Sequence, residues 1–402
     1  MEIRYPEYYK KFRCIAGDCP DTCCAGWEIA VDPASEKRYK EAAKTVKNRE
    51  FAKKLKKHMK NGLIISEDVM CPFLNQDRLC EMYIELGPES LCHTCKRHPR
   101  HMEDYGNLHE MVLLLSCPEV ARLVLEENSG GFYVRNLPDR QGHMDGIDEE
   151  LLELLLQIRE LIWNIGKNQR ISIENRMVFA LAMAHDVQRR LIKNDYQGMF
   201  EILKRYQKEG AVDRFLTEWQ GKQKKEVGDV VSDYVERFFL MSDFMEAFSK
   251  LEPIRCDWPK MLEETRSKLY HSKDSRACYL GKMGDFLRKS QGLNEDFEKL
   301  FGYFIYSFFL TSLYDGDVLT KVKMAVLCTE AIEELYLKAE VQTPDMRVEI
   351  CHALARQIEN SNENREELEQ ILKQKTFGTR RIIDALFSNM QMEVDEARIN
   401  PI

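Results

Sequence analysis

Hydrophobic residues recur at helical spacing through the C-terminal two-thirds of the chain. After residue 149, the first such series comprises Leu151, Leu152, Leu155, Ile158, Leu161 and Ile162. Steps of three and four residues place apolar side chains on one face of a helix. Ser172 then stands where a cap would begin the next helix, whose apolar face extends from Met177 to Leu191.

The helical pattern continues toward the end of the chain. Further helices are predicted at residues 197–208, 211–223, 229–250, 258–270, 277–291, 293–313, 316–339, 346–360, 364–374 and 378–389. Only four prolines follow residue 150, and we find neither a convincing strand nor a clean internal repeat there. The pattern therefore predicts an all-α domain over residues 149–402.

The first 127 residues are more irregular and carry seven of the twelve prolines. We expect strands at residues 27–32 and 108–115, strand or turn pieces at 63–65 and 70–74, and helices at 33–58, 80–86, 90–96 and 116–127. Ser116-Cys117-Pro118-Glu119 is typical of a helix start, with a cap followed by proline and acid. Gly, Pro, Asp and His are frequent between residues 128 and 148, which predicts a linker between two domains.

Charge and hydropathy narrow the class of protein. The net charge of −8 argues against a dedicated nucleic-acid binder, and the lysine-rich stretches are interpreted as solvated helix faces. The most apolar run, residues 300–310, is too short to cross a membrane and predicts a buried helix. The N-terminus lacks a signal-peptide pattern. We therefore expect a cytoplasmic protein that engages neither membrane nor nucleic acid.

Cysteine sets the first region apart, because nine of the thirteen cysteines lie within the first 117 residues. Clustered cysteines in the reducing cytoplasm are more often metal ligands or redox groups than disulfides. Thiolates select zinc, iron–sulfur clusters or Cu(I). Nine cysteines exceed the four that one centre needs, so either two centres form or several cysteines are bystanders. Buried free thiols and disulfides are the alternatives, and His93 and His98 are possible additional ligands beside Cys95.

This region resembles the flagellin lysine N-methylase family, and it is also similar to small zinc- or iron-chelating cysteine-cluster proteins. The matching motifs are Cys14-x4-Cys19-x3-Cys23-Cys24-x-Gly26-Trp27, Cys71-Pro72-Phe73-Leu74-x2-Asp77-x-Leu79-Cys80, Leu86-Gly87, Thr94-Cys95, Pro99-Arg100 and Ser116-Cys117-Pro118-Glu119. The later part resembles the family more loosely, through Asn168-Gln169-Arg170, Glu174-x-Arg176 and Arg356-x2-Glu359-Asn360.

The resemblance implies transfer of methyl groups from S-adenosylmethionine to lysine side chains of flagellin, together with a [4Fe–4S] cluster. Zinc is the alternative metal. The cysteines that fall on family positions, and are therefore the implied metal ligands, are Cys14, Cys19, Cys23, Cys24, Cys71, Cys80, Cys95 and Cys117. Cys92 falls on none and is interpreted as a bystander. Which four cysteines hold the cluster stays open.

Two common methyltransferase patterns are missing from the sequence. No glycine-rich turn follows a predicted strand, which disfavours a Rossmann-type site for S-adenosylmethionine. The spacing Cys19-x3-Cys23-Cys24 also departs from the Cys-x3-Cys-x2-Cys motif of radical enzymes. Direct displacement by a deprotonated lysine would suffice chemically, with the cluster then structural or regulatory. Both routes stay open.

The other candidate site residues are few. Arg100 can bind the carboxylate of the cofactor or form a surface salt bridge, and Trp27 is expected to shield the metal site from water. Glu359 can orient the substrate lysine with Arg356 holding it, although an ordinary helical ion pair is the favoured interpretation of their spacing. A non-enzymatic carrier, sensor or scaffold that binds zinc or an iron–sulfur cluster is the alternative function.

Overall fold

The computed structural model describes residues 1–25, 29–65, 70–127, 131–138, 140, 142–226, 234–271, 275–289, 292–341 and 343–387. It is mostly helical, which confirms the predicted class. The helices of the C-terminal part are α6 (Glu149–Gly166), α7 (Ile173–Leu191), α8 (Tyr196–Gln207), α9 (Ala211–Glu226), α10 (Tyr234–Phe248), α11 (Trp258–Leu269), α12 (Ser275–Lys289), α13 (Asn294–Phe308), α14 (Ser312–Asp315), α15 (Val318–Ala339), α16 (Pro344–Glu359) and α17 (Asn362–Leu372). Residues 379–387 are also helical.

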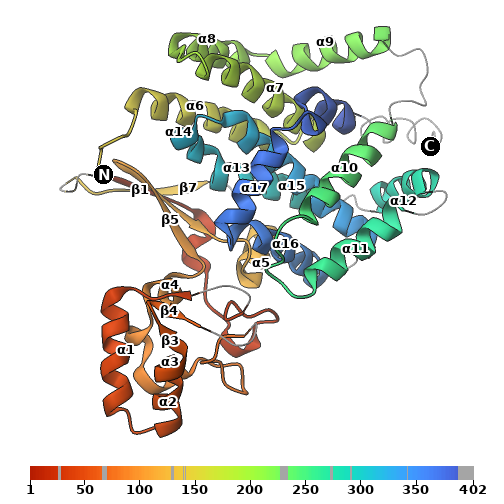
Figure 1. Cartoon of the computed structure of the whole chain (residues 1–402). Helices are drawn as coiled ribbons and strands as arrows, with labels where there is room; N and C mark the ends of the chain where they lie inside the picture. The colour runs from red at the N-terminus through yellow and green to blue at the C-terminus, as the bar shows by residue number, and fades with distance from the viewer. Residues whose placement is uncertain are drawn as a thin grey trace.

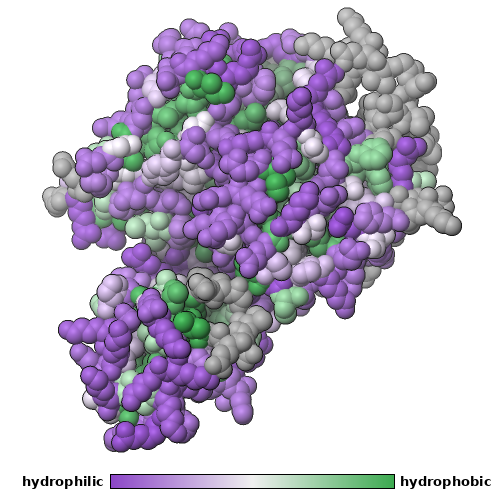
Figure 2. Space-filling model, viewed as in Figure 1, coloured by the Kyte–Doolittle hydropathy of each residue, from purple (hydrophilic) through white to green (hydrophobic). Residues whose placement is uncertain are grey.

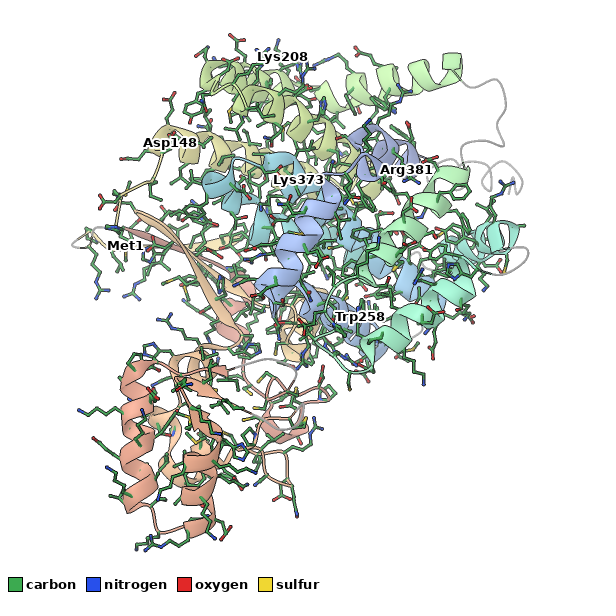
Figure 3. All side chains as sticks on the ribbon, in the orientation of Figure 1. Met1, Asp148, Lys208, Trp258, Lys373 and Arg381 are labelled. Atoms are coloured by element: carbon green, nitrogen blue, oxygen red, sulfur yellow. The ribbon has the colours of Figure 1, made fainter. Side chains whose placement is uncertain are left out.

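These helices agree closely with the predicted ones. Ser172 caps α7 as expected, because its hydroxyl accepts a hydrogen bond from the Asn175 amide at 3.4 Å. Past residue 149, the described part of the chain contains no strand. Predicted helical residues 229–233, 290–291 and 388–389 lie outside the described residues. Figure 3 labels Asp148, at the beginning of this helical domain, and Arg381, in its last described helix.

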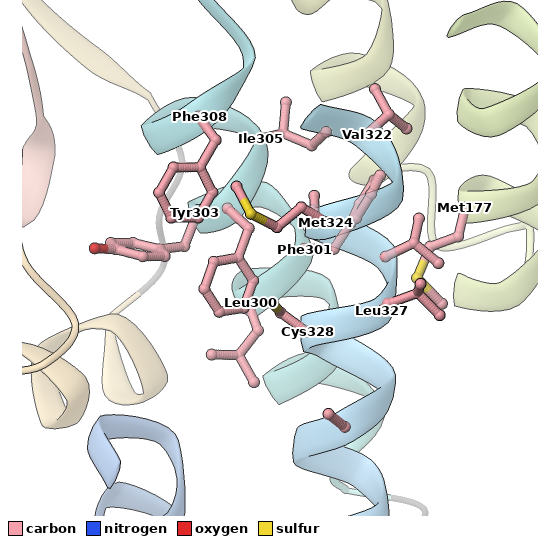
Figure 4. Packing of buried hydrophobic residues seen from close by; sticks show 14 of the residues in the cluster. Met177, Leu300, Phe301, Tyr303, Ile305, Phe308, Val322, Met324, Leu327 and Cys328 are labelled. Carbon is pink, nitrogen blue, oxygen red and sulfur yellow. The ribbon is translucent and has the colours of Figure 1, made fainter. Parts of the chain in front are cut away.

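The core of the helical domain is built around α15, whose residues are buried almost throughout (Figure 1). The apolar run at residues 300–310 forms the buried second half of α13 and the short 3-10 turn Phe309–Thr311, which confirms the predicted buried helix. Figure 4 shows Leu300 of α13 beside Cys328 of α15, and Leu327 of α15 beside Met177 of α7. Tyr303 directs its hydroxyl away from this packing (Figure 4).

A four-stranded sheet joins the N-terminal part to the same core. Its order is β5 (Arg100–Tyr105), β6 (Leu108–Leu113), β1 (Glu2–Pro6) and β7 (Phe132–Asn136), with β1 parallel to β6 and the other pairs antiparallel. Only β6 was predicted. β7 lies within the predicted linker, and α5 (Pro118–Glu126), which begins with Cys117 as its N-cap, packs on α13 and α16.

Residues 13–99, here called the cysteine module, leave this sheet and return to it. They contain β2 (Ile29–Ala30), α1 (Pro33–Thr45), α2 (Arg49–His58), β3 (Met59–Lys60), β4 (Leu63–Ile64), α3 (Glu81–Leu86) and α4 (His93–Arg97). The prediction of one helix over residues 33–58 is wrong, because the chain turns after Thr45 and Asn48 caps a second helix through a 3.1 Å bond from the Phe51 amide.

The module has a small hydrophobic core of its own, which includes Ile29, Tyr39, Phe51, Phe73 and Met82. Residues 1–12 and 100–125 contribute to the large core instead. The predicted boundary at residues 128–148 stays a prediction, but the packing separates the two cores near residues 13 and 99.

The surface seen in Figure 2 is largely hydrophilic, with scattered hydrophobic patches that include one on the module. Exposed large hydrophobic side chains of the module include Leu79, Tyr83 and Ile84. Among the described helices, none is both long and apolar enough to cross a membrane.

Candidate functional site

The eight predicted metal-binding cysteines all belong to the described residues, and they lie in loops and at helix starts. Cys14 is exposed and the other seven are partly buried. Cys80 and Cys117 occupy the N-cap positions of α3 and α5. Partial exposure leaves these thiols accessible to a ligand, in contrast to fully buried sulfur.

One set of thiols is held together by the module itself. The amide of Cys71 donates to the carbonyl oxygen of Cys24 at 2.7 Å, and Leu74 pairs with Cys80 in an isolated bridge. Cys71 and Cys80 also pack with Cys92 and Cys95 around the small core. Burial raises the pKa of Cys71 to about 12, with added contributions from the charges of Cys24, Cys80 and Cys92. We call these five cysteines the Cys71 group.

A second set lies where the module meets α5. Burial raises the pKa of Cys117 to about 12, and the nearby charges of Cys19 and Cys14 raise it further. The pKa of Cys23 is also raised, first by its hydrogen bond with Cys24, then by burial and by charges that include those of Cys117 and Cys14.

The donor set suits a thiophilic metal in kind. A hydrogen bond from Cys23 lowers the pKa of Cys24 to about 7, and one from Cys95 lowers that of Cys92 to about 6, so these two thiols ionise more readily than Cys71 and Cys117, whose pKa burial raises to about 12. Within the described ranges, no three side chains of His, Cys, Asp or Glu are arranged to hold a metal ion. The identity of the metal and of its ligands therefore stays a prediction.

Two residues of α16 that were predicted to be catalytic, Arg356 and Glu359, contact the loop of Cys23 and Cys24 and the segment before Cys117. Arg356 donates to the Asp21 carboxylate at 2.6 Å, to the Thr22 carbonyl oxygen at 3.3 Å and also to the Ala25 carbonyl oxygen. Its side chain is buried, and its Nε lacks a hydrogen-bond partner among the described groups. Arg356 therefore holds the loop that carries Cys23 and Cys24 by hydrogen bonds, and its Nε–H is the donor that remains unused among the described groups.

Glu359 holds the segment before Cys117. Its carboxylate accepts hydrogen bonds from the Ser116 amide at 2.7 Å and from the Tyr303 hydroxyl at 2.5 Å. Burial raises the pKa of Glu359 to about 7, although these two donors lower it. Both side chains thus contact the segments that carry the cysteines, and the helical ion pair that their spacing also allowed does not form.

Further charges surround Asp21 at this junction. The guanidinium of Arg255 and the Nδ1 of His352 each lie 3.7 Å from its carboxylate. Glu349 pairs with both, at 2.8 Å each, and its hydrogen bond with His352 is the main cause that lowers the pKa of Glu349 to about 2. Sequence reasoning missed Asp21, although an acidic residue between Cys19 and Cys23 was the available signal.

The remaining predicted residues have mixed outcomes. Arg100 places its guanidinium 4.9 Å from the centre of the Phe12 ring, so its structural contact is with an aromatic face. Trp27 lies outside the described residues. Burial lowers the pKa of His98 to about 4, helped by the charge of Arg356, which keeps a neutral imidazole near the junction. His93 is exposed, and its amide donates to Asp32 at 3.0 Å.

Comparisons with known proteins come from sequence alone, since no solved structure matches the chain. A family profile described as the FliB lysine N-methylase C-terminal domain matches residues 159–383. The lysine-N-methylase of Salmonella typhimurium strain LT2 is 35% identical over 134 residues, which are 32% of this chain and 33% of that protein. The flagellar biosynthetic protein FliU of Salmonella muenchen is 35% identical over 134 residues, which are 32% of this chain and 79% of FliU. The match thus spans about a third of the length of the lysine-N-methylase.

Proposed function

Because the chain belongs to the FliB lysine N-methylase family, we propose that it is a protein-lysine N-methyltransferase of the cytoplasm. In this proposal it transfers methyl groups from S-adenosylmethionine to lysine side chains of flagellin and carries a cysteine-bound [4Fe–4S] cluster. The observation that carries the proposal is the profile match over residues 159–383, which covers most of the helical domain. The names of the Salmonella relatives support the reaction and the flagellar link.

The chemistry requires a neutral lysine amine aligned with the sulfonium methyl group. A [4Fe–4S] cluster, when bound, would supply electrons for a radical route. In this chain the junction between module and helical domain is the proposed place of reaction, because it combines thiols, the buried Arg356 and a carboxylate of near-neutral pKa at Glu359. The roles of Arg356 and Glu359 in orienting lysine, and of Arg100 in binding a carboxylate, stay proposals.

The test is to incubate anaerobically purified protein with flagellin and S-adenosylmethionine and to analyse flagellin by mass spectrometry. We expect methylated lysines on flagellin. Unmodified flagellin, with the cluster shown to be intact, would refute the proposal. S-adenosylhomocysteine as sole coproduct would indicate direct displacement, whereas 5′-deoxyadenosine would indicate a radical route.

A carrier, sensor or scaffold without enzymatic activity is the second candidate. The nine clustered cysteines favour it, because metal binding alone would explain them. Iron, sulfide and zinc analysis of the purified protein identifies the metal, and retention of metal without any methyl transfer would support this alternative.

A further inference from the structure

A lysine side chain on the surface of the four-stranded sheet contacts two tyrosine rings. The Nζ of Lys10, in the 3-10 helix Glu7–Lys11, lies 5.0 Å from the centre of the Tyr133 ring and 5.4 Å from that of Tyr5. An ammonium group within about 6 Å of a ring centre is attracted by the negative face of the ring. Both rings therefore attract the same cation.

Strand pairing places the two tyrosines side by side. Tyr5 of β1 and Tyr133 of β7 are directly opposite each other in the antiparallel ladder, and their ring centres are 5.6 Å apart. Successive side chains of a strand point to opposite faces of a sheet. Phe132 packs on Trp163 of α6, so the neighbouring Tyr133 faces away from the helical domain. The pair is thus built by the sheet itself and does not depend on the side chain of Lys10.

A third tyrosine supports the pair from one side. The ring centre of Tyr9 is 5.5 Å from that of Tyr5. The ring of Tyr9 also faces the guanidinium of Arg100, which lies 6.0 Å from its centre. Tyr9 therefore restrains the ring of Tyr5, while its own contact is with a different cation.

The neighbouring lysine shows that the contact with the rings is particular to Lys10. Lys11 forms an ion pair with Glu127 at 2.5 Å. Among the described residues, Lys10 forms no ion pair with a carboxylate, so the tyrosine rings are the contacts of its ammonium group. Lys10 is exposed, and Tyr133 is 47% exposed. A ligand from solution can therefore reach the rings when Lys10 moves away.

We propose that Tyr5 and Tyr133 form a binding site for a methylated lysine side chain of the protein substrate, and that Lys10 occupies this site in the free chain. The inference rests on the proposed function, because a protein-lysine N-methyltransferase produces this ligand. Binding of the product here would keep flagellin on the enzyme between successive methyl transfers.

The preference for a methylated lysine follows from the competition with Lys10. An unmodified lysine carries the same ammonium group as Lys10 and gains nothing by replacing it. Methylation keeps the positive charge but replaces N–H groups that bind water with methyl groups that contact the rings. Quaternary ammonium groups are accordingly typical ligands of aromatic sites. Trimethyllysine should therefore displace Lys10, whereas unmodified lysine should not.

The experiment measures binding of a lysine-containing peptide to the full-length chain. A short peptide of glycine and serine with one central trimethyllysine is titrated with the protein and observed by proton NMR. The signal of the trimethylammonium group should move upfield, because aromatic rings shield protons that lie over their faces. The same peptide with unmodified lysine, or with a neutral tert-butyl group in place of the trimethylammonium group, should bind at least about fivefold more weakly.

Substitutions then assign the site to particular residues. Tyr133→Leu removes the aromatic face but keeps an apolar side chain, and it should weaken binding about fivefold. Tyr133→Phe keeps the face and should bind within about twofold of the unmodified chain. Lys10→Ala removes the competing cation and should strengthen binding about two- to fivefold. Lys11→Ala is the matched lysine control and Tyr314→Ala, at an exposed ring outside the site, is the aromatic control; both should leave the affinity unchanged.

Several results would overturn the inference. They are absence of an upfield shift with the folded chain, equal affinity for the tert-butyl peptide, and unchanged affinity in folded Tyr133→Leu. Circular dichroism checks that each variant folds, and Tyr133→Thr, which suits a strand, replaces Tyr133→Leu if that variant does not fold. Unchanged affinity in Lys10→Ala would refute occupation of the site by Lys10. Neither flagellin nor S-adenosylmethionine is present, so failure of the proposed reaction leaves these affinities interpretable.

Discussion

Cys328 and Cys351 lie in the core of the helical domain, completely buried, whereas Cys24, Cys71 and Cys95 lie partly exposed in the module. In the first region, burial raises the pKa of both thiols and keeps them protonated. In the second, hydrogen bonds between neighbouring thiols lower the pKa of Cys24 and Cys92 toward neutrality, whereas burial raises that of Cys71 to about 12. The comparison teaches that hydrogen bonds between neighbouring thiols, rather than burial or cysteine count, distinguish the thiols of lowered pKa, since Cys92 is itself buried.

The two regions also differ in what holds them together. The helical domain has a continuous core around α13 and α15, while the module packs a much smaller group of hydrophobic residues. A small core supplies little stability by itself, so such domains commonly depend on metals or disulfides. We therefore expect the module, and not the helical domain, to depend on bound metal.

Removal of metal should produce the largest difference in hydrogen-exchange protection between the module and the helical domain. We expect a chelator under reducing conditions to abolish hydrogen-exchange protection over residues 29–95 and to expose the module's thiols to alkylation. Residues 149–387 should keep their protection, with Cys328 and Cys351 unmodified. Equal loss of protection in both regions would contradict the comparison.

Truncation of a core aromatic should destabilise the helical domain. Phe304→Ala removes a fully buried ring of α13 and should lower the free energy of unfolding by about 3–5 kcal/mol. Urea denaturation followed by circular dichroism measures the change. Phe239→Ala, at a ring that is 46% exposed, is the control and should change stability by less than about 0.5 kcal/mol.

A buried carboxylate cluster should make the stability of the helical domain depend on pH between about 4.5 and 8. Arg237 contacts Glu330, Glu333 and Glu334 of α15, and burial raises the pKa of Glu330 to about 8. The folded state thus binds more protons at Glu330 than the unfolded chain does. The contribution of Glu330 to the free energy of unfolding is therefore complete below about pH 4.5 and decreases as the pH rises toward 8. We expect Glu330→Gln to flatten this slope in urea titrations between pH 5 and 8. An unchanged slope would contradict the assignment.

Loss of a helix cap should have the smallest effect on the free energy of unfolding. The hydrogen-exchange pattern after such a loss should show which residues unfold together. Asn48→Ala in the module and Ser361→Ala before α17 each remove a side-chain cap, which costs about 1 kcal/mol. Hydrogen exchange should show faster opening only near α2 for Asn48→Ala. For Ser361→Ala we expect a small decrease in stability across the helical domain. Identical exchange patterns would mean that the two regions unfold together.

The helical domain could be predicted well because its signals are local. Ser172 and the apolar face that follows it fix α7 without reference to distant residues. Strands β1, β5 and β7 escaped prediction because their pairing joins residues 2–6, 100–113 and 132–136, which the local pattern does not reveal. The break after Thr45 was also missed, since Asn48 alone is a weak cap signal.

The candidate site could be predicted by residue type but not by arrangement. Clustering pointed to nine thiols and the family resemblance to eight of them, but neither could predict that the Cys71 amide bonds to the Cys24 carbonyl oxygen, nearly fifty residues earlier. The contacts of Arg356 with Asp21 and of Glu359 with Ser116 span more than two hundred residues. Such pairs depend on how α16 packs near α5, and this is a property of the folded chain.

The contact between Arg100 and Phe12 has a consequence for how the gene can be rearranged. The chain leaves the sheet near Phe12 and comes back at Arg100, whose guanidinium lies 4.9 Å from the centre of the Phe12 ring. An inserted cassette with adjoining ends can be excised, or grafted into another host protein, with a short connecting peptide. Eight of the nine N-terminal cysteines are therefore carried on an insert whose two ends adjoin, while Cys117 and the α16 residues that hold the first cysteine loop remain in the rest of the chain.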